Sequence, residues 1–246
     1  MTEPDGTTPP ASRTVASSPY LERGSRSYWR ASVALLFTGY ATFSLLYYVQ
    51  PLLPEFSTAF GVGPAQSSLA LSFSTAALAA AVFVAGFVSE GLSRHRLMTA
   101  SLMLSSLLTL VAAFAPHWHQ MLALRALTGL ALGGVPAVGM AYLAEEVHPD
   151  GLGLAMGLYV GGNAIGGMAG RVIAGVLADL FTWRVAVGAI GVLGLASTLA
   201  FRALLAAVAV TSRRAAGSVL RSIARPLPAI SPAAANCPCC SRWASS

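Results

Sequence analysis

Long apolar stretches alternate with short polar segments along most of the chain. Six such stretches, at about 31–53, 66–88, 97–115, 121–143, 153–178 and 185–207, each approach the roughly 20 residues that a helix needs to cross a hydrocarbon core. Their polarity does not alternate residue by residue, as the strands of a membrane barrel require. Because helices satisfy their own backbone groups in lipid, the pattern predicts an all-α, polytopic membrane protein with six transmembrane helices.

The two ends of the chain differ from this apolar region. Residues 1–28 are rich in Ser, Thr, Pro and Arg, which predicts a disordered cytoplasmic tail. No A-x-A cleavage pattern precedes the first apolar run, so we interpret that run as a retained helix. The predicted domains are this tail, a transmembrane lobe over 29–207, and a basic Ser-, Pro- and Cys-rich tail over 208–246 that is disordered or out of frame.

The last residues carry a further signal. If Ser and Arg of residues 236–246 use their fourfold codon sets, a shifted reading frame would encode mainly apolar residues there, as at the start of an apolar helix. We therefore predict a frameshift near residue 206, with six more helices encoded by an intact relative. A genuine six-helix protein with a disordered basic tail is the alternative.

Composition and charge support a membrane protein. Hydrophobic residues make up 55% of the chain and charged residues only 10%, against about 25% charged in soluble proteins. The net charge is +6, but the arginines gather in the tails and one short loop, not on a face with interleaved aromatics, so we expect no nucleic-acid partner. Arginine-rich segments stay inside, which predicts a multi-pass protein of the inner (plasma) membrane with both termini cytoplasmic and the lipid bilayer as its surroundings.

Catalytic and metal-binding patterns are missing from the sequence. There is no phosphate-binding G-x-x-x-x-G-K-[ST], no H-E-x-x-H and no nucleophilic serine between glycines. Cys237, Cys239 and Cys240 lie together near the end without histidine or cysteine partners at ligand spacing. We predict no enzyme activity, no metal and no cofactor.

Two similar segments suggest an internal repeat. "AGFVSEGLSRHR" (85–96) ends the second apolar stretch and "AGVLADLFTWR" (174–184) ends the fifth, and both read A-G-x-x-x-acid followed by a base. The two stretches are three apart, so the copies face opposite sides of the membrane. This arrangement predicts a 3+3 inverted repeat.

The first of these segments resembles the loop signature of the major facilitator superfamily. The matching residues are Gly86, Glu90, Arg94 and Arg96, with Glu90 in place of the family's Asp. The resemblance implies one amino-terminal, six-helix lobe of a major facilitator fold, similar to bacterial proton-coupled efflux members, with this cluster as a cytoplasmic gating latch. Ordinary loop charges of the positive-inside kind are the alternative.

The fourth stretch holds Arg125, Gly129 and Gly133, four residues apart and therefore on one helix face. Glycines at this spacing let a neighbouring backbone approach closely. In the family an arginine of this helix is linked to proton coupling. The alternative is that Arg125 snorkels to the outer interface.

The fifth stretch resembles the glycine motif of the family's antiporter branch. Gly157, Gly166, Gly170 and Gly175 stand at the motif's spacing and are predicted to pack helices, whereas Arg171 replaces the usual proline. An arginine near mid-helix is costly in lipid, so we expect it to face a wet cavity and an anionic or hydrogen-bond-accepting substrate. A structural tie to a carbonyl or carboxylate is the alternative.

Other candidates complete the set. Asn163 either lines the same face as Arg171 or makes a packing hydrogen bond, and Tyr48 and Gln50 are either cavity residues or interface anchors. Asp179 and Arg184 resemble the residues that close the family's fifth helix, which predicts a helix-end clamp. With no carboxylate in mid-helix, the proton carrier is Glu90, Asp179 or a residue of an absent half.

These predictions combine into one function. We expect a secondary active transporter of small organic molecules, working by proton-coupled efflux and alternating access, with a missing carboxy-terminal lobe or a second lobe as partner. The alternative is a truncated, non-transporting membrane protein, or a half-unit that functions only when paired.

Overall fold

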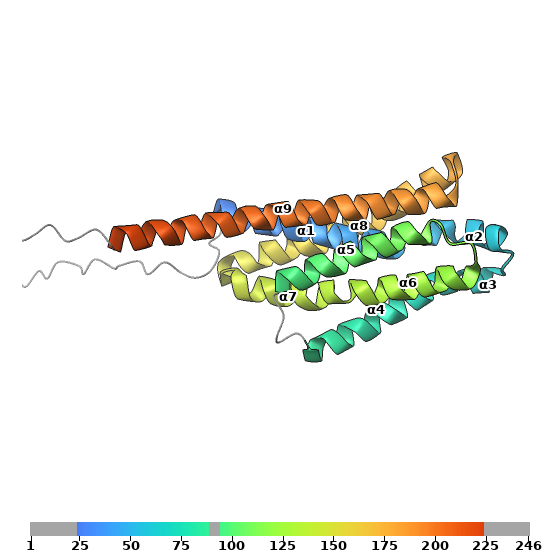
Figure 1. Ribbon diagram of the computed structural model, residues 1–246, viewed down its shortest axis with the longest axis horizontal. Coiled ribbons are helices and arrows are strands. Elements are labelled where there is room, and N and C mark those ends of the chain that lie inside the picture. Colours follow the sequence, from blue (N-terminus) through green and yellow to red (C-terminus); the bar gives the residue numbers. More distant parts are fainter. Residues whose placement is uncertain (1–23, 89–93, 224–246) are drawn as a thin grey trace, which may run out of the picture. The chain divides into compact units, whose positions relative to one another are not determined.

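The computed structural model describes residues 24–88 and 94–223, and within them the chain forms a bundle of helices (Figure 1). The elements are α1 (Arg26–Tyr47), η1 (Gln50–Leu52), α2 (Leu53–Phe60), α3 (Pro64–Ser67), α4 (Leu69–Val88), α5 (Arg94–Ala112), α6 (Trp118–Leu132), α7 (Gly134–Glu146), α8 (Pro149–Leu180) and α9 (Trp183–Ile223). Six spans are long and apolar enough to cross a membrane: Arg26–Phe60, Pro64–Ala85, Arg94–Ala112, Trp118–Ala141, Pro149–Leu180 and Trp183–Leu204. The prediction of six transmembrane helices is therefore confirmed.

Prolines interrupt two of the predicted helices. The first span stops at Tyr47, turns through η1 and resumes as α2, and Pro51 and Pro54 lie in the first positions of these two short elements. The fourth span, expected as one helix, is divided into α6 and α7 at Gly133. Pro136 explains this break, because it offers no N–H to the carbonyl four residues earlier and its ring collides with that turn.

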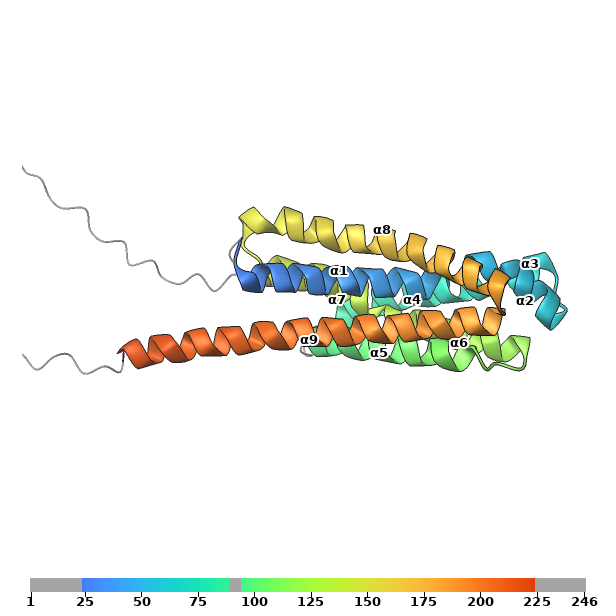
Figure 2. The same cartoon turned by 90° about the horizontal axis from the view of Figure 1, so that it is seen from above.

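The pairing of the spans has the symmetry of an inverted repeat. α1 packs most extensively against α8, and α4 against α6 (Figure 2). In a 3+3 repeat the first span corresponds to the fourth and the second to the fifth. The repeat therefore predicts that the first span pairs with the fifth in the same way as the fourth pairs with the second. The two observed pairs, α1 with α8 and α6 with α4, have this relation.

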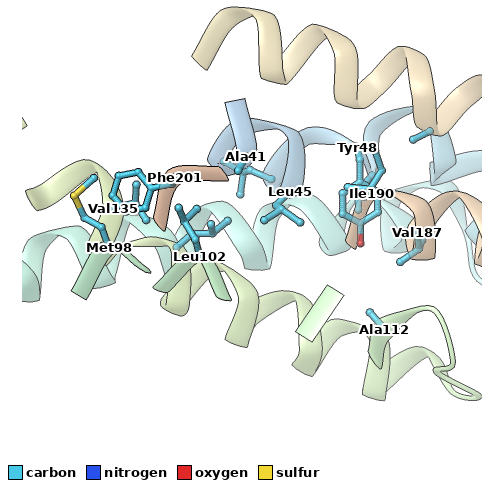
Figure 3. Packing of buried hydrophobic residues seen from close by; sticks show 14 of the residues in the cluster. Ala41, Leu45, Tyr48, Met98, Leu102, Ala112, Val135, Val187, Ile190 and Phe201 are labelled. Atoms are coloured by element: carbon cyan, nitrogen blue, oxygen red, sulfur yellow. The ribbon is translucent and has the colours of Figure 1, made fainter. Parts of the chain in front are cut away.

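A continuous apolar core joins α1, α5, α7 and α9 (Figure 3). Leu45 of α1, Leu102 of α5, Val135 of α7 and Ile190 of α9 are buried in this cluster. Large apolar side chains that point away from it, such as Phe114, which is 80% exposed, suit a lipid environment. The core therefore fixes the lobe from within while its outside remains apolar.

Several buried serine and threonine hydroxyl groups in the spans bond to their own helices. The Oγ1 of Thr42 donates to the Thr38 carbonyl at 2.8 Å, and the Oγ1 of Thr109 donates to the Ser105 carbonyl at 2.9 Å. A bond to the carbonyl four residues earlier satisfies a polar group where no water is available. These residues can therefore lie in an apolar bundle without a partner on another helix.

The chain divides into two units, residues 1–206 and 207–246. α9 continues to Ile223, beyond the predicted end of the sixth span at 207. Residues 208–223 contain no proline and are helical, where the sequence predicted a disordered or out-of-frame tail. The predictions for residues 1–23 and 224–246, including the three cysteines, lie outside the described residues.

Candidate functional site

Arg125 of α6 is completely buried and binds the end of another helix. Its Nη1 donates to the Leu45 carbonyl at 3.1 Å and its Nη2 to the Leu46 carbonyl at 2.8 Å, while Nε reaches the Ala70 carbonyl of α4 at 3.5 Å. The last four carbonyls of a helix lack intrahelical partners, and Leu45 and Leu46 stand in the last turn of α1. Arg125 thus caps α1 from the side and joins α1, α4 and α6.

Tyr48 completes the surroundings of Arg125. The guanidinium carbon lies 4.9 Å from the centre of the Tyr48 ring, a distance typical of a cation–π contact. Tyr48 is itself 0% exposed. Arg125 therefore does not snorkel to the outer interface, and Tyr48 lies inside the lobe (Figure 3).

Arg171 of α8 has the opposite surroundings. It is exposed, and among the described residues no hydrogen bond or ion pair to its guanidinium is found. Its contact is the ring of Tyr47, whose centre lies 4.9 Å from the guanidinium carbon. A cation at this depth costs at least about 2.5–3.5 kcal/mol in lipid, so its surroundings in the membrane must supply water or an acceptor. The structural tie to a carbonyl or carboxylate is not formed within the described part of the lobe.

Asn163 lies at the contact between α8 and α1. It is half-buried, and a Cβ placed on Gly39 of α1 would overlap its Oδ1 atom. Asn163 thus packs against α1, and its packing hydrogen bond stays a prediction. Gln50 is half-buried at the start of η1.

The glycine face of α8 meets the backbone of α1. A Cβ on Gly162 or Gly166 would overlap the carbonyl of Leu36 or Tyr40, and one on Gly170 would lie 2.8 Å from the Cα of Ser44. These glycines stand four apart, which aligns them on one face of α8. The packing prediction is therefore supported for Gly166 and Gly170, and Gly162 belongs to the same face.

Two other predicted packing glycines of α8 behave differently. A Cβ on Gly157 would meet nothing within 4 Å, so inside this lobe Gly157 packs no helix. The reason is its position five residues before Gly162, which turns it away from α1. Gly175 is less crowded than Gly170, since its Cβ would lie 3.5 Å from the Cβ of Pro51, an ordinary contact.

Gly129 of α6 and Gly133, which follows the end of α6, lie against α4. A Cβ on Gly129 would overlap the carbonyl oxygen of Ser74, and one on Gly133 would overlap the Cβ of Ala81. Close approach of α4 and α6 thus depends on both glycines, in line with the packing role predicted for them.

The helix-end clamp takes a different form from the predicted one. No ion pair joins Asp179 to Arg184 within the described residues, where both side chains are exposed. Arg184 instead donates from Nη1 to the Ala113 carbonyl at 3.0 Å, and its guanidinium carbon lies 4.3 Å from the centre of the Trp183 ring. The clamp therefore ties the start of α9 to the segment between α5 and α6.

An aromatic cluster, not predicted from the sequence, lies where α6 and α9 begin. Phe56 of α2 lies 5.4 Å from Trp183 and 6.3 Å from Trp118, between ring centres, and Phe60 lies 5.5 Å from Trp118. Phe56 is fully buried. The cluster fixes the short helix α2 to α6 and α9.

The cytoplasmic loop motif is only partly described. Gly86 falls within α4, and Arg94 and Arg96 begin α5, whereas Glu90 lies outside the described residues. The latch thus stays a prediction. A separate tie at the start of the bundle is present, because the Tyr28 hydroxyl donates to the Gly151 carbonyl at 2.8 Å and joins α1 to α8.

Comparison with known proteins places this lobe in a family. The model of the major facilitator superfamily matches residues 23–236. The chain belongs to the major facilitator superfamily. Within the superfamily, the inner membrane transport protein YnfM of Escherichia coli is 49% identical over 182 residues, which cover 74% of this chain and 44% of YnfM. The uncharacterized MFS-type transporter YybF of Bacillus subtilis is 42% identical over 182 residues, covering 74% of this chain and 45% of that protein.

The fold also resembles a solved facilitator structure. A crystal structure of the peptide transporter POT superposes with a TM-score of 0.64 and 13% identity, over 78% of this chain and 45% of that chain. The prediction of an all-α lobe of a major facilitator fold is confirmed. The chain spans somewhat less than half the length of the curated relatives it matches.

Proposed function

We propose that this lobe is half of a secondary active transporter that moves small organic molecules by alternating access, and that it works with a second six-helix lobe. Membership of the superfamily and the similarity to YnfM support transport as the class of activity. The chain covers 44% of YnfM, which supports the need for a second lobe.

The observation that carries this proposal is the surface of α8. Gly153, Gly157 and Gly161 have open space where a Cβ would stand, and Arg171 is exposed further along the same helix. A face of open glycines with an arginine that no described residue neutralises is poorly suited to lipid. It suits a helix that packs against a second lobe and borders a hydrated pathway between the lobes.

We further propose proton-coupled efflux across the inner membrane, with both termini cytoplasmic. The glycine face of α8 supports this direction through its resemblance to the antiporter motif, although Arg171 replaces the motif's proline. Among the described residues, the carboxylates of the spans lie near helix ends, such as Glu55, Asp150 and Asp179. The proton therefore binds Asp179, the loop residue Glu90 or a carboxylate of the second lobe.

Vesicle reconstitution tests the proposal. The full chain is reconstituted with a pH gradient, alone and together with the carboxy-terminal half of YnfM, and proton movement is followed while a panel of small organic molecules is added. We expect substrate-dependent proton flux from the pair, with neither half active alone. Absence of flux from the pair for every compound would refute the proposal and favour a non-transporting membrane protein.

A further inference from the structure

Arg171 lies well inside its membrane-spanning helix, and its N–H donors are not used by the described residues. It lies about 13 Å along the helix axis from Leu180, the last residue of α8, at roughly 1.5 Å per residue. The guanidinium is always charged and carries five N–H donors, and no described residue accepts from any of them. Arg125 shows the contrast, because its donors are used on carbonyls of α1 and α4.

Tyr47 holds the guanidinium in a defined place. Its ring centre lies 4.9 Å from the guanidinium carbon, and Phe43 supports the ring at 5.7 Å between centres with an interplanar angle of 37°. Gly167 of α8 faces the same corner, since a Cβ there would stand in ordinary contact with Phe43 and Tyr47 at 3.8 Å. The Tyr47 ring lies against the guanidinium, and no described residue accepts a hydrogen bond from its N–H groups.

We propose that Arg171 and Tyr47 form a binding subsite for the carboxylate of a small organic anion. The edge of a guanidinium matches the two oxygens of a carboxylate and binds them with two parallel N–H···O bonds. Tyr47 is the positioning residue, because it fixes the orientation of the guanidinium without touching the anion. This inference rests on the proposed function in that it places the subsite on the transport pathway, and it names organic carboxylates as the substrate class.

Side-chain spectra of arginine test the subsite directly. The full chain is labelled with 15N-arginine, purified in a neutral detergent free of lipid, and titrated with benzoate or with its neutral analogue benzamide at constant ionic strength. The Nε–H signal of Arg171 is assigned by its loss in Arg171→Lys. We expect benzoate to shift this signal with saturation and benzamide to leave it unchanged.

Arg202 is the matched control, because it is also exposed on a membrane-spanning helix, α9, and has no aromatic contact among the described residues. Nonspecific ion pairing would shift the Arg202 and Arg171 signals alike, and that result would overturn the subsite. Equal shifts with benzamide would overturn it as well. Phosphatidylglycerol, added at the same concentration, tests whether Arg171 binds the phosphate of a lipid instead of a carboxylate. If it binds more strongly than benzoate, Arg171 is a lipid-binding residue and the proposed carboxylate subsite is refuted.

Two substitutions test the role of Tyr47. Tyr47→Phe keeps the ring and should leave benzoate affinity unchanged, whereas Tyr47→Leu should weaken it roughly three-fold, as expected for a partly exposed cation–π contact. An unchanged Arg125 signal reports an intact fold in each variant. If Tyr47→Leu binds as tightly as the wild type with that signal intact, Tyr47 does not position the cation. Binding needs neither a second lobe nor a gradient, so the two experiments can give different results. Benzoate binding without flux would support the subsite and refute the proposed transport, whereas flux without benzoate binding would support transport and refute the subsite.

Discussion

Replacing Arg125 should weaken the lobe even though it removes a buried charge. Arg125→Met loses two good hydrogen bonds to Leu45 and Leu46, worth about 1 kcal/mol each in a membrane protein, and a desolvated cation–π contact worth about 2 kcal/mol. It also strands carbonyls at the end of α1, at about 1–3 kcal/mol each. Relief of the guanidinium's desolvation returns about 3 kcal/mol. We expect a net loss of at least about 3 kcal/mol in the free energy of unfolding.

Arg125→Lys separates the charge from the geometry. Lysine keeps the charge but has no planar fork for two neighbouring carbonyls and stacks less well on an aromatic ring, so we expect an intermediate loss of about 1–2 kcal/mol. Unfolding in mixed micelles of increasing SDS fraction, followed by tryptophan emission, measures the difference. Arg202→Met serves as the control for removal of an exposed arginine.

The order of the free energies of unfolding tests the capping role of Arg125. Wild type should be the most stable, then Arg125→Lys, then Arg125→Met. If Arg125→Met proves as stable as the wild type or more so, desolvation outweighs the bonds, as happens for some buried ions, and the capping role is refuted. If Arg125→Lys equals the wild type, charge alone suffices and the paired carbonyl bonds are unimportant.

Three further predictions concern packing and use the same unfolding measurement. Gly166→Leu should lose about 3 kcal/mol because a side chain there overlaps the backbone of α1, whereas Gly157→Leu, in open space, should change stability by less than about 0.5 kcal/mol; equal losses would contradict the packing account. Phe56→Ala should lose about 3–5 kcal/mol and shift tryptophan emission to the red, and unchanged emission would argue against the aromatic cluster. Tyr28→Phe removes one 2.8 Å hydrogen bond and should lose about 1 kcal/mol, whereas no loss would show that the tie to α8 is unimportant.

The sequence was sufficient for the spans because membrane thickness sets their length and apolar character. It was less reliable for breaks within a span. Pro51 and Pro54 lie near the predicted end of the first stretch, where a break is expected, whereas Pro136 lies inside the fourth stretch, which was predicted as one helix. A proline that follows two glycines is a local signal for a broken helix and was available in the sequence.

The side-chain partners were harder to predict, because neighbouring residues on a helix point about 100° apart. Tyr48 was selected from the sequence, yet it is Tyr47 that meets Arg171, while Tyr48 turns inward to Arg125. Periodicity alone does not say which face of α1 meets α8. Gly157 was assigned to packing for the same reason, since the motif gives spacing but not orientation relative to a neighbouring helix.

Arg125 and Arg171 look equivalent in the sequence, since each is an arginine in an apolar run. Their partners in the structure differ, so removing each arginine should have a different effect. Arg125 is fully buried and donates its N–H groups to backbone carbonyls, so its loss should lower stability whether or not a ligand is present. Arg171 is exposed and makes no described hydrogen bond, so its loss should leave stability nearly unchanged and remove anion binding. The contrast fits the transporter lobe proposed above: one cation stabilises the scaffold, and the other remains available for a ligand because the scaffold does not depend on it.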